Sequence, residues 1–145
     1  MMATTLATYL RPVVIATIGE TVGTAARRLR DSHVGCVVVT REGRPIGIVT
    51  DRDLAVRVVA EGLDPETTKI DEIVTFDPAT LRDYETVDTA VLRMKEHGVR
   101  RLPIVDGEGS VVGIVTADDL LVRIGRQLAA VAEAIECGAD ASDSR

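Results

Sequence analysis

Aromatic residues are almost absent from this sequence: its 145 residues include one Phe, two Tyr and no Trp. Few side chains are therefore available to stack on unpaired bases, which is how proteins commonly hold single-stranded nucleic acids. The formal net charge of -6 also gives no general attraction for a phosphate backbone. Together these two features argue against a nucleic-acid-binding protein.

Cysteines are also rare, and long apolar runs are missing. The two cysteines, Cys36 and Cys137, are too few for a disulfide framework. No segment approaches the run of about 18 apolar residues that a membrane-spanning helix requires. The beginning of the sequence lacks the basic stretch, apolar block and cleavage site of a secretory signal. We therefore expect a cytoplasmic protein with no membrane partner.

The residue patterns of catalytic and metal centres are missing as well. The two histidines and two cysteines are too far apart in sequence to indicate a metal site. No serine–histidine–aspartate, cysteine–histidine or paired-carboxylate arrangement can be defended from spacing. We therefore expect no catalytic residues, no metal and no enzymatic activity. His33 and His97 stand near the ends of predicted helices, where we expect them to cap carbonyl groups rather than contact a ligand.

The chain does contain a duplication. Residues 20–54 align with residues 85–120 when one gap is placed opposite Gly107, and 15 of the 35 aligned pairs are identical. The match ends in nearly the same eight letters, GIVTDRDL at 47–54 and GIVTADDL at 113–120. Because a chance similarity would not keep register over this length, we interpret the two stretches as copies of one structural unit.

Each copy has the same predicted order of elements: a helix, two strands joined by a hairpin, and a second helix. Apolar residues spaced three and four apart follow Thr21 and Thr86, which predicts amphipathic helices capped by these threonines. Short β-branched runs separated by turn residues predict pairs of strands. The predicted strands span residues 36–40, 46–50, 102–105 and 111–116. The predicted fold class is therefore α/β.

The domain organisation follows from this order of elements. We expect a first repeat at residues 9–66 and a second at residues 74–136, with a polar linking segment at 62–71. Residues 137–145 are expected to form a disordered tail. Because about 55 residues alone bury too little apolar surface, the two repeats should pack face to face.

The repeated octapeptide allows two interpretations of its threonine and aspartate. Thr50 and Asp53 have the spacing of a helix capping box at a predicted strand-to-helix junction, and Thr116 and Asp119 repeat it. In this structural interpretation they only satisfy backbone amides and stabilise a helix. The same groups also suit a ligand, because free amides and a hydroxyl bind phosphate and an aspartate accepts hydrogen bonds from a ribose. The spacing alone leaves both interpretations open.

The second copy, with its segments HGVRRLPIVD and GIVTADDL, resembles the cystathionine-β-synthase-type (CBS) domain. Two such domains in tandem resemble a Bateman module, and the likeness covers about residues 9–125. The resemblance implies two CBS-type repeats packed about a pseudo-twofold axis, with adenosyl ligands in clefts between them. The ligands it implies are AMP, ADP, ATP, S-adenosylmethionine or a dinucleotide, with no obligatory cofactor.

The resemblance also assigns ligand-binding residues to two clefts. In each cleft the threonine and aspartate of the octapeptide would bind phosphate and ribose, and a residue of the opposite repeat would complete the wall. The residues implied are Thr50, Asp53 and Thr80 for one cleft, and Thr116, Asp119 and Ile15 for the other.

Arg100 and Arg101 make the two clefts unequal. They stand where the first copy has Gly35 and Cys36, and a guanidinium matches the geometry of a phosphate. In similar nucleotide sensors a basic residue at this place meets the phosphates, which implies that the Asp119 cleft takes a charged nucleotide. The alternative role of the two arginines is solvation of the surface.

We therefore expect a regulatory module that binds an adenine nucleotide between its repeats and signals to an unknown protein partner. The alternative is a structural or dimerising module of the same fold whose clefts stay empty. A homodimer is expected, because the predicted helices carry more apolar surface than two short sheets can cover.

Overall fold

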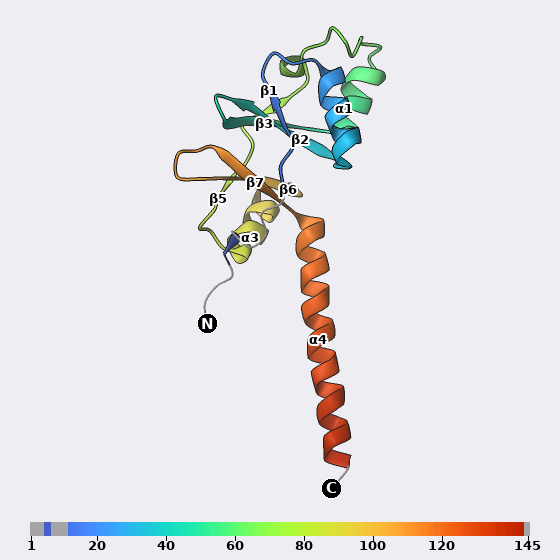
Figure 1. Ribbon diagram of the computed structural model, residues 1–145, viewed down its shortest axis with the longest axis vertical. Coiled ribbons are helices and arrows are strands. Elements are labelled where there is room, and N and C mark those ends of the chain that lie inside the picture. Colours follow the sequence, from blue (N-terminus) through green and yellow to red (C-terminus); the bar gives the residue numbers. More distant parts are fainter. Residues whose placement is uncertain (1–4, 7–11, 144–145) are drawn as a thin grey trace. The chain divides into compact units, whose positions relative to one another are not determined.

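The computed structural model describes residues 5–6 and 12–143 of the chain. They belong to two compact units, which divide between Val115 and Thr116. Two of the elements are short helices of other kinds, a π-helix labelled η2 and a 3₁₀ helix labelled η3, and Figure 1 shows the arrangement. The elements in chain order are β1 (Ile15–Thr17), α1 (Val22–Ser32), β2 (Cys36–Arg41), β3 (Arg44–Thr50), α2 (Asp51–Leu54), η2 (Ala55–Val59), η3 (Ile70–Glu72), β4 (Thr75–Phe76), β5 (Leu81–Arg82), α3 (Val87–His97), β6 (Arg101–Val105), β7 (Val111–Thr116) and α4 (Ala117–Asp143).

The first sheet has the strand order β1-β2-β3-β4. Strand β1 runs parallel to β2, whereas β2 pairs with β3 and β3 with β4 in antiparallel fashion. A two-residue loop joins β2 to β3, and both of its residues, Glu42 and Gly43, have positive φ angles of 52° and 79°. This backbone is typical of the tight hairpin turn whose twist matches that of the strands. The predicted hairpin is therefore confirmed.

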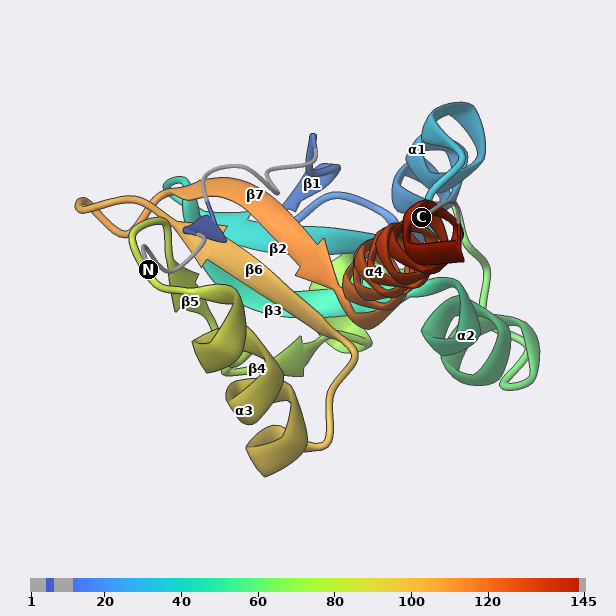
Figure 2. The ribbon, with the colours of Figure 1, turned by 90° about the horizontal axis from the view of Figure 1, so that it is seen from below.

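The second sheet repeats the first three strands of the first, in the order β5-β6-β7. Strand β5 is parallel to β6, as β1 is to β2. Figure 2 shows β2 and β3 lying over β6 and β7. Between the sheets, Cys36 and Val38 of β2 form an apolar cluster with Ile114 of β7. The predicted duplication and the predicted face-to-face packing are both confirmed.

Helices α1 and α3 occupy equivalent places and have equivalent ends. The hydroxyl oxygen of Thr21 accepts a hydrogen bond from the Thr24 amide, and that of Thr86 accepts one from the Thr89 amide. Both helices end in a left-handed residue, which is His33 after α1 and Gly98 after α3. The caps predicted from the sequence are therefore present, although at His33 a non-glycine residue takes the conformation that favours glycine.

The linking segment 62–71 differs from a simple polar connection, because it packs along the start of α1. The carbonyl oxygens of Thr68 and Pro65 accept hydrogen bonds from the amides of Val22 and Gly23, each at 2.9 Å. These amides have no acceptor within their own helix, so the linker satisfies them. The side chain of Ile70 is fully buried and belongs to the core of the first repeat.

Helix α4 is one continuous helix of 27 residues. It extends the predicted last helix as far as Asp143, so the expectation of a disordered tail was wrong for residues 137–143; residues 144–145 lie outside the described part. The composition of this stretch, rich in alanine and acidic residues, had suggested a tail. Alanine is also the best helix former, and here that preference prevails.

Candidate functional site

A pocket of about 470 Å³ lies within the first compact unit. Three segments form its walls: the end of β3, the chain from β4 towards β5, and the connection from α3 to β6. The lining residues are Ile48, Thr50, Thr75, Phe76, Asp77, Pro78, Ala79, His97, Val99, Arg100 and Arg101. The pocket therefore draws on both repeats, as the sequence predicted for a ligand cleft.

Gly47 allows β4 to form one wall of this pocket. Gly47 of β3 pairs with Phe76 of β4, and a Cβ atom at Gly47 would overlap the side chain of Val74 and lie 2.6 Å from the carbonyl oxygen of Thr75. Only a residue without a side chain permits this approach. The missing side chain at Gly47 therefore makes room for a second backbone.

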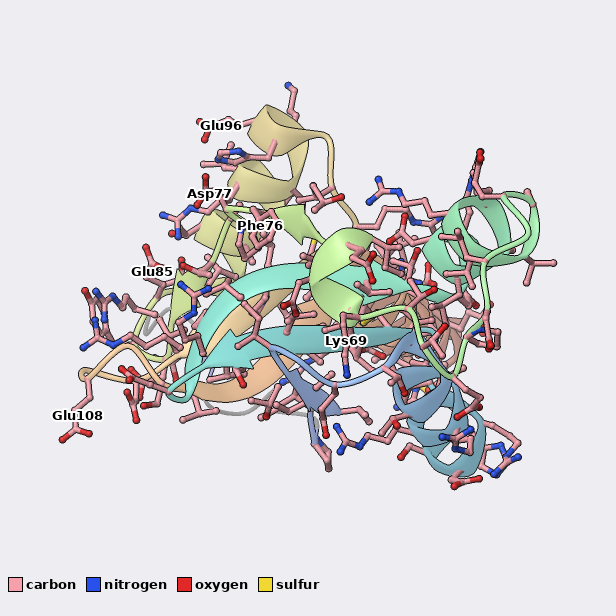
Figure 3. All side chains as sticks on the ribbon, turned by 90° about the horizontal axis from the view of Figure 1, so that it is seen from above. Lys69, Phe76, Asp77, Glu85, Glu96 and Glu108 are labelled. Atoms are coloured by element: carbon pink, nitrogen blue, oxygen red, sulfur yellow. The ribbon has the colours of Figure 1, made fainter. Side chains whose placement is uncertain are left out.

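Arg57 holds the same wall from the other side. Its guanidinium donates hydrogen bonds to the carbonyl oxygen of Ile73 at 2.5 Å and to the hydroxyl of Thr75 at 3.0 Å. After β4 the chain turns at Asp77, whose φ angle is 56° and whose amide donates to the carbonyl oxygen of Ile46. Figure 3 shows Phe76 and Asp77 on this segment, beside helix α3. The wall is thus fixed by defined contacts at both ends.

Thr50 and Asp53 form the complete capping box that their spacing predicted. The hydroxyl oxygen of Thr50 accepts from the Asp53 amide at 3.1 Å, and the carboxylate of Asp53 accepts from the Thr50 amide at 2.8 Å. The second carboxylate oxygen of Asp53 lies 3.8 Å from the guanidinium of Arg57. Thr50 lines the pocket, whereas Asp53 does not. The structural interpretation of this threonine–aspartate pair is confirmed, and the ligand-binding interpretation stays a prediction.

Arg100 and Arg101, which are predicted for the cleft of Asp119, line the pocket that contains Thr50. Their place in the cleft of Asp119 stays a prediction. One guanidinium nitrogen of Arg101 lies 3.3 Å from where a Cβ atom of Gly35 would stand, and a carboxylate oxygen of Asp51 lies 3.5 Å from that point. The start of β6 therefore approaches the first repeat at its strand-to-helix junction. Aligned positions in a duplicated chain do not reveal which repeat a side chain faces.

Cys36 lies within the electrostatic field of the same arginine. Burial raises the pKa of its thiol, and the nearby charge of Arg101 opposes this effect. A raised pKa keeps the thiol protonated at neutral pH, so Cys36 is a buried apolar residue of β2, as predicted.

Thr80 and Ile15, the residues expected to complete the two clefts, occupy matching environments. Arg93 donates a hydrogen bond to the carbonyl oxygen of Thr80, as Arg28 does to that of Ile15, each at 2.7 Å. Each of these arginines is also paired with a glutamate that precedes its helix, Glu85 or Glu20. The pairing lowers the pKa of both glutamates, with the hydrogen bonds from the arginine as the main cause. Ala79, next to Thr80, is the residue that lines the pocket.

Thr116 and Asp119 share a hydrogen bond of the capping arrangement. The hydroxyl oxygen of Thr116 accepts a hydrogen bond from the Asp119 amide at 3.2 Å. Both residues belong to the second compact unit, whereas Ile15 belongs to the first. A second ligand cleft formed by these three residues stays a prediction.

Among the pocket residues that were not expected from the sequence are Phe76, Asp77, His97 and Val99. The first two lie outside the repeated stretches, so the alignment gave no reason to select them. The sequence did offer one signal, since Phe76 is the single Phe of the chain. In the structure its side chain is 51% exposed and therefore available to a ligand. His97 was expected only to cap α3, but its side chain reaches the pocket wall.

Among residues 5–6 and 12–143, no three histidine, cysteine, aspartate or glutamate side chains are grouped so that they could hold a metal ion. No helix in that part of the chain has the length and apolar character needed to cross a membrane.

Comparison with known proteins identifies the repeats. The family model described as "CBS domain" matches this chain twice, at residues 8–60 and 70–126. An uncharacterized protein of Methanopyrus kandleri is 38% identical over 112 residues, which are 77% of this chain and 57% of that protein. The chain therefore spans little more than half the length of this relative.

Two solved structures have a similar fold and hold adenosyl compounds. The CBS domain pair of protein MJ0100, in complex with 5'-methylthioadenosine and S-adenosyl-L-methionine, matches with a TM-score of 0.76 and 27% identity. The match covers 87% of this chain and 99% of that chain. A CBS domain protein from Pyrobaculum aerophilum, complexed with AMP, matches with a TM-score of 0.73 and 30% identity, over 81% of this chain and 90% of that one.

Proposed function

The chain belongs to the CBS domain family as a tandem pair, and on this basis we propose that it is a regulatory module that binds an adenosyl ligand in the pocket of Thr50. The observation that carries this proposal is the composition of the pocket. It joins an apolar wall containing Phe76 to two arginines and a threonine hydroxyl. An adenosyl compound has the same two parts, a flat apolar base and a polar or charged end.

The volume of the pocket supports a ligand of this size. Ligand pockets usually measure about 300–1,000 Å³, and this one measures about 470 Å³. The adenine ring stacks against the exposed face of Phe76 and packs on Ile48 and Val99. Stacking of a base on an aromatic ring contributes about 1–3 kcal/mol. The base therefore occupies the apolar wall.

Arg100, Arg101 and the hydroxyl of Thr50 bind the phosphate end. Arginine donates paired hydrogen bonds in a fixed plane that matches a phosphate, and each charge-assisted bond contributes about 1.5–3 kcal/mol. This arrangement favours AMP, ADP or ATP over S-adenosylmethionine, whose tail carries a positive sulfonium. Asp53 positions Thr50 through the capping box and, as the family resemblance implies, accepts a hydrogen bond from the ribose.

The test is a thermal-unfolding series with AMP, ADP, ATP, adenosine, S-adenosylmethionine and NAD. A ligand present at 100 times its dissociation constant stabilises the folded state by about 2.7 kcal/mol. For a protein of this size that corresponds to an increase in Tm of roughly 5–10 °C. If none of the compounds raises the Tm at millimolar concentration, the alternative of a structural or dimerising module is the correct one.

Variants then locate the site. Arg101→Ala should weaken nucleotide binding roughly 10- to 100-fold, which is the loss expected for one charge-assisted bond, and should change adenosine binding little. Phe76→Ala should weaken nucleotide and adenosine equally. Arg41→Ala is the matched control, because this exposed arginine of β2 is not part of the pocket. Equal effects of Arg41→Ala and Arg101→Ala would exclude this pocket as the phosphate site.

Binding of the ribose by Asp53 can be tested separately from its role in the helix cap. In Asp53→Asn the side-chain carbonyl still accepts a hydrogen bond from the Thr50 amide, so the cap persists, but the negative charge is lost. Weaker binding at unchanged Tm would support a direct contact with the ribose. Unchanged binding would leave Asp53 with the capping role alone.

Signalling to a protein partner is the second part of the proposal, and membership of the family supports it. Helix η2 begins four residues after Asp51 and is a π-helix, a strained form that is often found at functional sites. Ligand-dependent hydrogen exchange of η2 and of the segment after β4 tests whether binding changes these elements. A protein whose exchange is the same with and without bound nucleotide has no conformational signal to pass on.

A further inference from the structure

Helix α4 carries a row of large apolar side chains that are exposed. Six large apolar side chains of this helix are between 42% and 68% exposed. They are Leu121, Val122, Ile124, Leu128, Val131 and Ile135. An exposed apolar surface of this length is unusual for a protein that works alone and marks an interaction surface.

Five of these residues are spaced as in a two-stranded coiled coil. The positions 121, 124, 128, 131 and 135 are separated by three, four, three and four residues. This is the alternation that places side chains in one seam along a helix and lets them interlock with an equal seam on a second helix. Val122 stands beside the seam at its first turn. We call the five-residue row the α4 seam.

Three of the four residues that flank the α4 seam are small, and the fourth is Gln127. Gly125, Ala132 and Ala134 occupy flanking positions, where many coiled coils have long charged side chains. Glycine is unfavourable in the middle of a helix, and a Cβ atom at Gly125 would have no neighbour within 4 Å in the described chain. Small flanks leave room for another helix backbone to approach closely.

The charges of α4 indicate the occupant and its direction. Arg123 and Arg126 lie in the first half of the helix, and Glu133 and Glu136 lie in the second half. Asp118 and Asp119 precede the seam, and within residues 121–136 these four are the only charged residues. A second copy running in the opposite direction therefore places the two arginines of each seam next to the two glutamates of the other. A parallel copy would place like charges at the same height, which is unfavourable.

We propose that the α4 seams of two copies of this chain pair in antiparallel orientation. The register sets Leu128 opposite Val131 of the second copy, and Ile124 opposite Ile135 of the second copy. In the same register Arg126 lies at the height of Glu133 of the second copy, and Arg123 at that of Glu136. These charges are on the outer faces, so they select the direction of pairing through their field rather than by direct contact.

This proposal does not depend on the ligand pocket. It makes the expected homodimer specific, because it names the helix, the residues of the seam and their direction. A lipid surface is a less suitable occupant, since the polar face of α4 carries acidic as well as basic residues and membrane-surface helices are predominantly basic.

The first experiment is the mass of the particle by light scattering at tens of micromolar. The expected mass is twice the 15.5 kDa of the chain. Leu128→Glu places two charges in the middle of the seam and should give the monomer mass. Ala130→Glu is the matched control, because it adds the same charge two residues away on the outer face and should leave the dimer intact. A monomeric wild type, or a Leu128→Glu variant that stays dimeric, overturns the proposal.

The second experiment tests the direction by disulfide cross-linking, in a Cys137→Ser background that removes the exposed thiol. The variant with Ile124→Cys and Ile135→Cys together should form covalent dimers under mild oxidation. Ile135→Cys alone should not, because antiparallel pairing separates the two copies of position 135 by about 11 residues, or roughly 17 Å. Efficient cross-linking of Ile135→Cys alone would show a parallel pair. No cross-linking of the double variant would exclude this register.

Discussion

The ion pair of Glu85 and Arg93 lies within the second repeat. It offers a direct test of the contacts that stabilise each repeat. The guanidinium of Arg93 donates to both carboxylate oxygens of Glu85 at 2.9 Å and to the carbonyl oxygen of Thr80 at 2.7 Å. The two charged side chains are only 29% and 19% exposed. We predict that Arg93→Met, which keeps the long apolar stem, lowers the stability of the protein markedly.

The magnitude follows from what the substitution leaves behind. Glu85 keeps its hydrogen bond from the Arg82 amide but loses both bonds from Arg93, and the Thr80 carbonyl loses its donor. Hydrogen bonds to charged groups contribute about 1.5–3 kcal/mol when they are shielded from water, and partial exposure reduces this. We expect a loss of about 1–3 kcal/mol, which lowers the Tm by roughly 3–10 °C.

The effect should depend on pH in a defined direction. Arg93 lowers the pKa of Glu85 below its ordinary value of 4.5, so the folded state favours the charged carboxylate. The stability that the pair contributes is complete above pH 4.5 and is lost as the pH falls through the lowered pKa of the folded state. The difference in Tm between wild type and Arg93→Met should therefore be constant from pH 7 to about pH 5 and shrink at lower pH.

The assay is thermal unfolding followed by circular dichroism across this pH range. Arg30→Met is the control, because Arg30 and Asp31 form an ion pair whose side chains are 70% and 64% exposed. It should leave the Tm unchanged. Arg28→Met, which breaks the equivalent pair of the first repeat, should resemble Arg93→Met. If Arg93→Met melts like Arg30→Met, or if its deficit is independent of pH, the pair does not contribute as argued.

Three further predictions concern the pocket and its surroundings. Gly47→Ala should lower both the Tm and nucleotide affinity, because a Cβ atom would overlap the neighbouring strand, whereas Gly107→Ala, with open space around it, should change neither. Thr50→Ala should cost about 0.5–2 kcal/mol in chemical denaturation through loss of the cap, and Thr50→Ser should restore it. In timed alkylation read by mass spectrometry, the exposed Cys137 should react well before the buried Cys36, whose thiol pKa is raised; equal rates would contradict the burial argument.

The elements of the fold were predictable because their signals are local. Strand β7 has the predicted bounds, and β2, β3 and β6 differ from the prediction by one or two residues at their ends. The caps at Thr21 and Thr86 depend on a threonine and the few residues after it, so the sequence of one short segment determines them. The duplication added a second reading of each element, which made the common order of helix, hairpin and helix secure.

The irregular parts were less predictable, since contacts from distant segments decide them. The stretch after α2 has the composition of an ordinary helix, yet Ala55–Val59 forms a π-helix. The segment 62–71 has the composition of a linker, yet its carbonyl groups complete the first turn of α1. In both cases the local sequence allows several structures, and contacts with distant segments of the chain determine which one forms.

The candidate site shows the same limit at the level of function. Thr50 was identified correctly as a residue of a cleft because it belongs to a repeated motif at a strand-to-helix junction. Arg101 was predicted for the cleft of Asp119, and its place in the pocket of Thr50 was missed, since alignment compares equivalent positions and a cleft joins non-equivalent ones. Phe76 was missed because it lies between the repeated stretches, in β4, which pairs with the first sheet although it precedes the second repeat's helix.

A consequence for duplicated proteins follows from Arg101. Duplication gives two equivalent junctions, but the side chains that complete the pocket of Thr50 come from the second copy and from the segment between the copies. At these positions the two copies differ, as Gly35 and Cys36 differ from Arg100 and Arg101. The chemistry of the pocket therefore resides in the differences between the repeats, whereas the fold resides in their identities. Arg101→Cys, which gives the second copy the residue that the first copy has at the aligned position, Cys36, should remove the discrimination between nucleotide and adenosine while retaining most of the stability.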